Sequence, residues 1–111
     1  MGREKSRNRL RKNVTLGQRR TSVSLEEQVW NGLVEICRRE DIGIDELCTE
    51  VEKLRVGSSM SSALRVFLLT YFQSIAEALE DGKNSDDTAN LSVVLDRFHA
   101  EQIHAGGTIR D

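Results

Sequence analysis

Hydrogen-bonding side chains occupy every second position in the segment RTSVSL, residues 20–25. The polar set is Arg20, Ser22 and Ser24, and the alternating set is Thr21, Val23 and Leu25. This period of two predicts a short β-strand with one polar face and one apolar face. Arginine can bind guanine through two hydrogen bonds, and a serine hydroxyl can donate or accept one. The polar face could therefore read base edges in DNA.

Side chains that could catalyse a reaction or hold a metal are few and isolated. Cys37 and Cys48 fall on predicted apolar stripes, which is typical of buried thiols rather than of a disulfide framework or a zinc site. His99 and His104 are five residues apart, a spacing that does not suit one metal ion on a helix. Ser61 has no histidine or lysine base beside it in the sequence. We expect no catalytic residue, no metal and no cofactor, and hence no enzyme.

Charge is divided unevenly along the 111 residues, although the net charge is only −2. Residues 1–20 contain eight lysines and arginines against Glu4 alone, which gives +7. The remaining residues contain the other eight against 17 acids, which gives −9. We expect residues 1–19 to form a disordered basic arm that contacts an anionic partner, either nucleic acid or a membrane surface. Its cations are Arg3, Lys5, Arg7, Arg9, Arg11, Lys12 and Arg19.

The residues that follow the predicted strand show the apolar periodicity of helices. Apolar residues recur at helical spacing over 26–40, over a segment that begins near Asp45, and over 61–79. Residues 81–90 are polar, and residues 91–105 could form a short helix. The chain therefore divides into an arm (1–19), one domain (20–80), and a polar linker with a C-terminal helix (81–111).

A lone short strand is unstable because its backbone groups need a neighbouring strand. No later segment has comparable strand character, so we expect the partner strand to come from a second copy of the chain. The face of the third helix is also broader than so small a chain could cover, which indicates an interface. The expected dimer core comprises Val23, Leu25, Trp30, Leu33, Ile36, Leu47 and Val51.

Membrane insertion is not expected, because no apolar run reaches the roughly 18 residues that a spanning helix needs. The N-terminus has no apolar stretch of the kind found in secretory signals. The reduced cytoplasm is the expected compartment.

Three separated blocks, RTSVSLEEQVWNGLVEI, GIDELCTEV and MSSALRVFLLTYF, carry a resemblance that covers roughly residues 19–73. In order and spacing they resemble a bacterial ribbon-helix-helix DNA-binding family with an added third helix. The resemblance implies a mainly α fold with one short N-terminal strand. It implies an intertwined homodimer whose antiparallel ribbon takes one strand from each chain and enters the major groove, as in the Arc and methionine repressors. It also implies a phosphate clamp of backbone N–H groups at Gly43, Ile44 and Asp45.

These observations favour a protein that binds double-stranded DNA sequence-specifically as a homodimer, or as a higher oligomer on DNA. Of the two anionic partners considered for the arm, nucleic acid and a membrane surface, duplex DNA is the one expected. A transcriptional repressor or regulator at the nucleoid is the expected role. The alternative is a protein-interaction module, or an antitoxin-like scaffold, that holds a partner protein through the third helix or residues 81–111.

Overall fold

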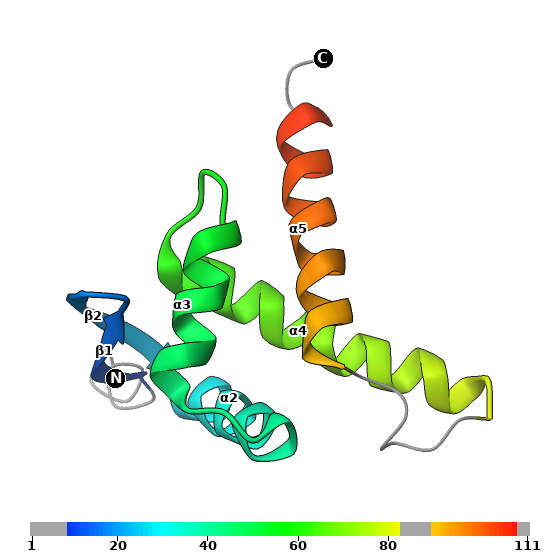
Figure 1. Ribbon diagram of the computed structural model, residues 1–111, viewed down its shortest axis with the longest axis horizontal. Coiled ribbons are helices and arrows are strands. Elements are labelled where there is room, and N and C mark those ends of the chain that lie inside the picture. Colours follow the sequence, from blue (N-terminus) through cyan, green and yellow to red (C-terminus); the bar gives the residue numbers. More distant parts are fainter. Residues whose placement is uncertain (1–8, 83–89, 109–111) are drawn as a thin grey trace, which may run out of the picture.

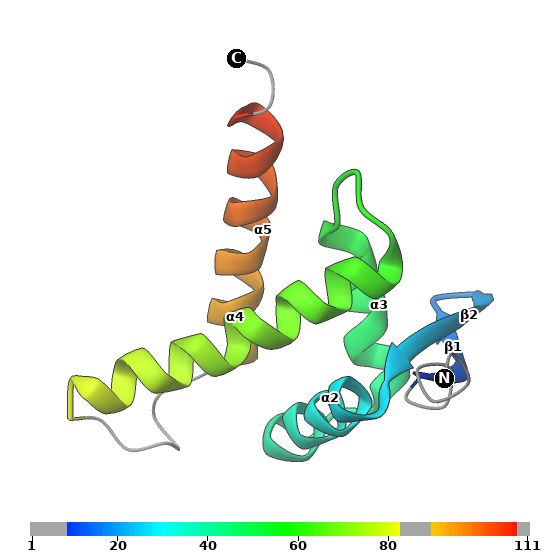
Figure 2. The same cartoon turned by 180° about the vertical axis from the view of Figure 1, so that it is seen from behind.

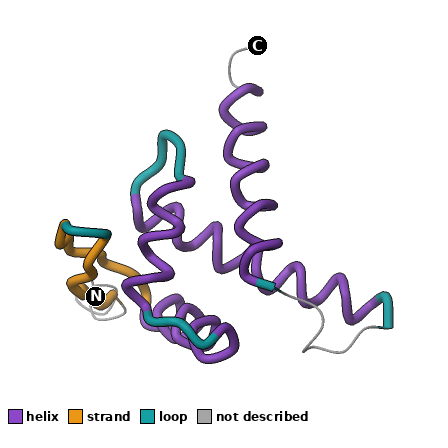
Figure 3. The backbone as a smooth tube through the Cα atoms, in the orientation of Figure 1, coloured by secondary structure: helices purple, strands orange, loops and turns teal. Residues whose placement is uncertain are grey.

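Two strands and four helices form the part of the chain that a computed structural model describes, residues 9–82 and 90–108 (Figures 1 and 3). In chain order they are β1 (Arg9–Leu16), β2 (Arg19–Glu26), α2 (Glu27–Glu40), α3 (Ile44–Leu54), α4 (Met60–Glu80) and α5 (Leu91–Thr108). The predicted mainly helical class with strand structure at the N-terminus is confirmed. Each predicted helix is present with its start within about a residue of the expected position.

β2 pairs with a strand of its own chain, and this corrects two expectations. Residues 9–16, which the sequence analysis placed in a disordered arm, form β1 and pair antiparallel with β2. The neighbour that β2 requires is therefore supplied within the chain and not by a second copy. The remaining arm residues, Arg3, Lys5 and Arg7 among them, lie outside the described part of the structure.

A two-residue connection closes this hairpin. Gly17 and Gln18 join Leu16 to Arg19, and Gly17 has a φ of +64°. Glycine adopts this conformation without the steric cost of a Cβ atom, and Gly-X is a favoured sequence for tight hairpins. Val14 and Leu16 of β1 then point to the same side as Val23 and Leu25 of β2, and all four are buried.

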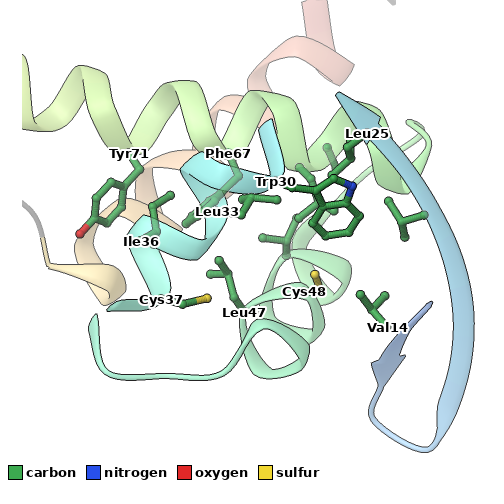
Figure 4. Packing of buried hydrophobic residues seen from close by; sticks show 14 of the residues in the cluster. Val14, Leu25, Trp30, Leu33, Ile36, Cys37, Leu47, Cys48, Phe67 and Tyr71 are labelled. Atoms are coloured by element: carbon green, nitrogen blue, oxygen red, sulfur yellow. The ribbon is translucent and has the colours of Figure 1, made fainter. Parts of the chain in front are cut away.

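The inner face of the hairpin covers one end of a single hydrophobic core. Figure 4 shows Val14 and Leu25 directed toward the cluster that contains Leu33 of α2 and Leu47 of α3. Phe67 of α4 belongs to the same cluster. The seven residues predicted to form a dimer core are all 0–2% exposed within one chain. They form the core of a single subunit, so their burial needs no second chain.

The C-terminal helix α5 crosses α4 and completes this core. Phe98 meets Phe67 edge to face, with ring centroids 5.8 Å apart, and Val94 is also buried. Arg97 pairs with Glu77 of α4 at 2.9 Å. In the two opposite views α5 rises steeply from α4, and α3 lies between it and the hairpin (Figures 1 and 2). The helix expected over 91–105 is thus present, and it extends to residue 108.

Both cysteines are free and buried, as their place on apolar stripes predicts. Burial raises the pKa of Cys48 to about 12, so this thiol stays protonated and unreactive at neutral pH. The described helices include none with the length and apolar character required to cross a membrane.

Candidate nucleic-acid interface

The strand register decides which side chains share the exposed face of the hairpin. In an antiparallel pair, residues directly opposite each other point to the same side. Asn13 lies opposite Ser22, Arg11 opposite Ser24, and Thr15 opposite Arg20. We call this side the outer face. It comprises Arg9, Arg11, Asn13 and Thr15 of β1 with Arg20, Ser22, Ser24 and Glu26 of β2.

The three residues predicted to read bases all belong to this outer face. Arg20 and Ser22 are exposed, and Ser24 is half-buried. They project away from Val23 and Leu25, whose side chains enter the core. The period-two pattern therefore predicted correctly which residues of β2 point away from the core.

Sequence reasoning missed the other half of the outer face. Asn13 and Thr15 were not singled out, and Arg11 was assigned to a disordered arm. The signal was the alternation of Leu10, Val14 and Leu16 with polar residues, followed at once by Gly17-Gln18. A two-residue Gly-X connection between two alternating segments is a hairpin pattern.

The outer face is held by hydrogen bonds to the helices behind it. The Trp30 indole donates to the Leu10 carbonyl at 2.8 Å, and the Ser61 hydroxyl donates to the Ser24 carbonyl at 3.1 Å. The Thr15 N–H donates to the Asp45 carboxylate at 3.0 Å. Each bond fixes a backbone group of a strand to α2, α4 or α3, so the ribbon is positioned at several points along its length.

A two-stranded ribbon followed by helices is the order of elements over residues 9–80. The model of the ribbon-helix-helix domain matches residues 10–72, which is more than half of the chain. The chain belongs to the ribbon-helix-helix family. Neither the curated proteins nor the solved structures contain a match.

The matched part of this ribbon-helix-helix chain begins inside β1 and ends within α4. Both strands of the hairpin therefore fall within the family domain, whereas α5 lies beyond it. Ribbon-helix-helix domains generally bind DNA as transcription regulators and are usually dimeric. The domain is a regulatory DNA-binding fold and is not typically enzymatic.

The predicted phosphate-contacting cations of this ribbon-helix-helix domain have different surroundings. Arg11 lies on the outer face, and Arg9 donates to the Ser24 carbonyl at 3.3 Å. Lys12 instead points to the inner side, with its ammonium 5.3 Å from the centroid of the Trp30 ring. Arg19 also belongs to the inner set and pairs with Glu52 at 3.0 Å. Lys12 and Arg19 therefore contact α2 and α3 while both side chains remain exposed, and their contact with phosphates stays a prediction.

The one carboxylate of the outer face is paired. Arg65 of α4 binds Glu26 through two nitrogens, with the shorter contact at 2.9 Å. The hydrogen bond from Arg65 lowers the pKa of Glu26, so the carboxylate is charged at neutral pH. This pairing offsets the negative charge of Glu26, and Arg11 and Arg20 give the rest of the face a positive character.

The predicted phosphate clamp lies where α3 meets the hairpin. Gly43 is the residue that precedes the helix, and Ile44 and Asp45 open its first turn. The Asp45 side chain does not cap its own helix, because its carboxylate accepts from Thr15 of β1. Thr49, one turn later, accepts from the Gly17 N–H at 3.2 Å. The N-terminus of α3 therefore sits beside the ribbon.

Proposed function

We propose that this chain binds double-stranded DNA sequence-specifically through the outer face of its β1–β2 hairpin and acts as a transcriptional repressor. The observation that carries the proposal is the composition of that face. Apart from Glu26, which is paired with Arg65, the outer face carries only arginines and neutral hydrogen-bonding side chains. The buried apolar residues of both strands all lie on the opposite side. The major groove admits a two-stranded ribbon, and its base edges carry a distinguishable code.

Three groups of residues are proposed to have separate roles in this complex: the outer face of β2, the start of β1 and the start of α3. Arg20 is proposed to bind guanine through its guanidinium, with Ser22 and Ser24 contacting neighbouring base edges. Arg9 and Arg11, with the basic residues that precede them, are proposed to contact phosphates. The N–H groups that open α3 are proposed as a phosphate clamp at Gly43, Ile44 and Asp45, supported by their position beside β1.

The proposed active form is a homodimer in the cytoplasm, bound at the nucleoid. Each subunit would bring its own ribbon, so a dimer would contact two half-sites in successive major-groove segments. Since the core residues are already buried within one subunit, the contacts between subunits would use surface residues. Exposed apolar side chains on α4, Val66 at 39%, Leu69 at 57% and Leu79 at 48%, offer such a surface.

Replacement of Arg20 by alanine tests the proposal. Bound sequences would be selected from a random duplex pool near physiological salt, for the natural protein and for Arg20→Ala. We expect discrimination at one G·C position to fall roughly 5- to 150-fold, the worth of one bidentate contact. Arg38→Ala is the matched control, since Arg38 is exposed and lies on α2 away from the ribbon. Unchanged discrimination in the Arg20 variant would contradict the assignment.

A second candidate function, binding of a protein partner, is favoured by one feature. An open hollow between the end of α2, α3 and the start of α5 is lined by four carboxylates. Its lining is Glu40, Glu46, Glu50, Leu54, Leu91, Ser92, Leu95 and Asp96. A partner with a basic surface would suit it. Co-purification of a stoichiometric basic partner that Glu46→Lys abolishes, without DNA retardation at moderate salt, would favour this candidate.

A further inference from the structure

We infer that Asn13 of β1 determines specificity for adenine, and that Ser22 of β2, besides the base contact proposed for it above, is the positioning residue of Asn13. The inference rests on the proposed function, because it assumes that the outer face of the hairpin meets base edges. It assigns the second strand of the ribbon a direct part in sequence recognition.

The register places Asn13 near the middle of the outer face. It is the fifth of eight residues in β1, and Ser22 opposite it is the fourth of eight in β2. Both residues are exposed. Arg11 and Thr15 flank Asn13 along β1 on the same face, so Asn13 has charged or hydroxyl-bearing neighbours and no apolar cover. A ribbon that enters a groove presents its middle residues to the base pairs.

The carboxamide of Asn13 has the chemistry that adenine requires. The major-groove edge of adenine offers one acceptor, N7, and one donor group at N6. An asparagine side chain offers an acceptor oxygen and two N–H donors, so it can bind both positions at once. Among the described residues of the outer face, Asn13 is the one carboxamide.

Ser22 fixes the orientation of that carboxamide. Its hydroxyl donates to Asn13 Oδ1 at 3.0 Å across the two strands. An amide oxygen has two lone pairs, so one remains for the N6 donor of adenine while both Asn13 N–H groups stay available for N7. The bond keeps the oxygen on the β2 side and turns the NH2 group away from it. Asn13 would therefore meet a base with its amide already oriented.

Selection from a random duplex pool tests the inference with two substitutions at residue 13. Asn13→Ala removes both donor and acceptor, and we expect preference for A·T at one position to fall roughly 5- to 150-fold. Asn13→Asp keeps an acceptor for Ser22 but loses the N–H donors. A carboxylate accepts from N4 of cytosine, so this variant should change its preference at that position from adenine to cytosine.

Two substitutions at residue 22 separate positioning from structural effects. Ser22→Ala should weaken the preference at the same base position, and Ser22→Thr, which retains the hydroxyl, should restore it. Asn31→Ala is the matched control, because Asn31 is an exposed asparagine on α2. Thermal unfolding of each variant would verify that the hairpin is intact.

The outcomes distinguish failure of the role of Asn13 from failure of the proposed DNA-binding function. If the natural protein selects no sequence, the proposed function fails. If it selects a site and Arg20→Ala alters that site while both Asn13 variants keep the natural preferences, the function stands and the role of Asn13 is overturned. If Asn13→Ala loses the adenine preference but Ser22→Ala keeps it, Asn13 remains a reader and Ser22 is not its positioning residue.

Discussion

Neighbouring cations in the basic segment have different partners, although a count of charges treats them alike. Arg11 points to the outer face of the ribbon, whereas Lys12 faces the Trp30 ring on the inner side. Arg19 pairs with Glu52 and Arg20 remains on the outer face. In a strand, side chains alternate between faces, so adjacent residues in this segment have opposite surroundings. The pattern on β2 therefore predicted correctly that Arg20, Ser22 and Ser24 share one face. Composition alone does not show that Lys12 and Arg19 lie on the other face, and the DNA contacts of all five residues stay predictions.

Trp30 belongs to the core and also bonds to the backbone of the ribbon. It is 2% exposed, its indole donates to the Leu10 carbonyl at 2.8 Å, and Lys12 lies over its ring. Trp30→Phe keeps much of the apolar volume but removes the N–H donor. We expect the free energy of unfolding to fall by about 1–3 kcal/mol, the cost of leaving a partner unsatisfied. Denaturant unfolding would measure the loss.

A matched variant, Lys12→Met, can show whether the stability lost in Trp30→Phe is localised to β1. Lys12→Met removes the ammonium that lies over the ring and keeps a flexible side chain, so it should cost about 0.5–1 kcal/mol or less. Hydrogen exchange should increase at amides of β1 in Trp30→Phe more than in Lys12→Met. Equal and unchanged exchange in both variants would show that the indole bond does not hold the strand.

At the scale of elements, the helices were predicted, whereas β1 was missed because its short alternating pattern is a weaker signal than the helical ones. The apolar residues of α2, α3 and α4 recur every three or four positions over many residues, and such patterns survive local exceptions. β1 contains Arg9, Arg11 and Lys12, and this density of charge resembles a disordered segment. Its strand structure depends on contacts distant in sequence, such as those of Thr15 with Asp45 and of Leu10 with Trp30. A pattern within eight residues does not contain those contacts.

The C-terminal helix α5 lies beyond the family match, yet it is tied to three other helices. Asn90 accepts from the Ser92 N–H at 2.9 Å and so caps the helix. Glu40 of α2 accepts from both the Leu91 N–H and the Tyr71 hydroxyl, at 3.1 and 2.6 Å. Phe98 is fully buried against Phe67. These contacts stabilise the subunit, and we expect α5 to lie outside the complex with DNA.

Phe98→Ala tests this role. The substitution would leave a cavity beside Phe67, and we expect a loss of about 3–5 kcal/mol in the free energy of unfolding. His99→Ala, an exposed neighbour on the same helix, should change stability by less than about 0.5 kcal/mol. At a temperature where Phe98→Ala remains folded, it should select the same DNA sequences as the natural protein. A changed base preference would instead place α5 in the DNA complex.

At the scale of the molecule, basic and acidic side chains gather in different places: arginines lie on the hairpin and carboxylates line the hollow beside α5. Arg11 and Arg20 lie on the hairpin, and the hollow beside α5 is lined by carboxylates such as Glu46 and Asp96. α3 lies between the hairpin and α5 in both ribbon views (Figures 1 and 2). A positive end would meet DNA while the acidic end is repelled from phosphates, which favours one orientation of the subunit on the duplex.

Truncation of the basic N-terminus tests how much of the affinity is independent of sequence. A deletion that reaches residue 18 would remove β1, so the informative deletion is residues 1–8, which precede the strand. Arg3, Lys5 and Arg7 are lost in this variant and the hairpin is retained. We expect affinity to fall by a similar factor on every duplex, because phosphate contacts carry no base information. Base preferences from the random pool should be unchanged.

The dependence of binding on salt gives the same test a quantitative form. Each phosphate contact contributes about 0.9 to the slope of log affinity against log salt concentration. Loss of the three cations should therefore reduce the slope by about 2–3 per chain. A variant with residues 2–8 in shuffled order is the matched control, and it should keep the natural slope because its charge is the same. A slope unaffected by the deletion would assign the phosphate contacts to Arg9, Arg11 and the start of α3 alone, and an altered base preference would show that residues 1–8 read sequence.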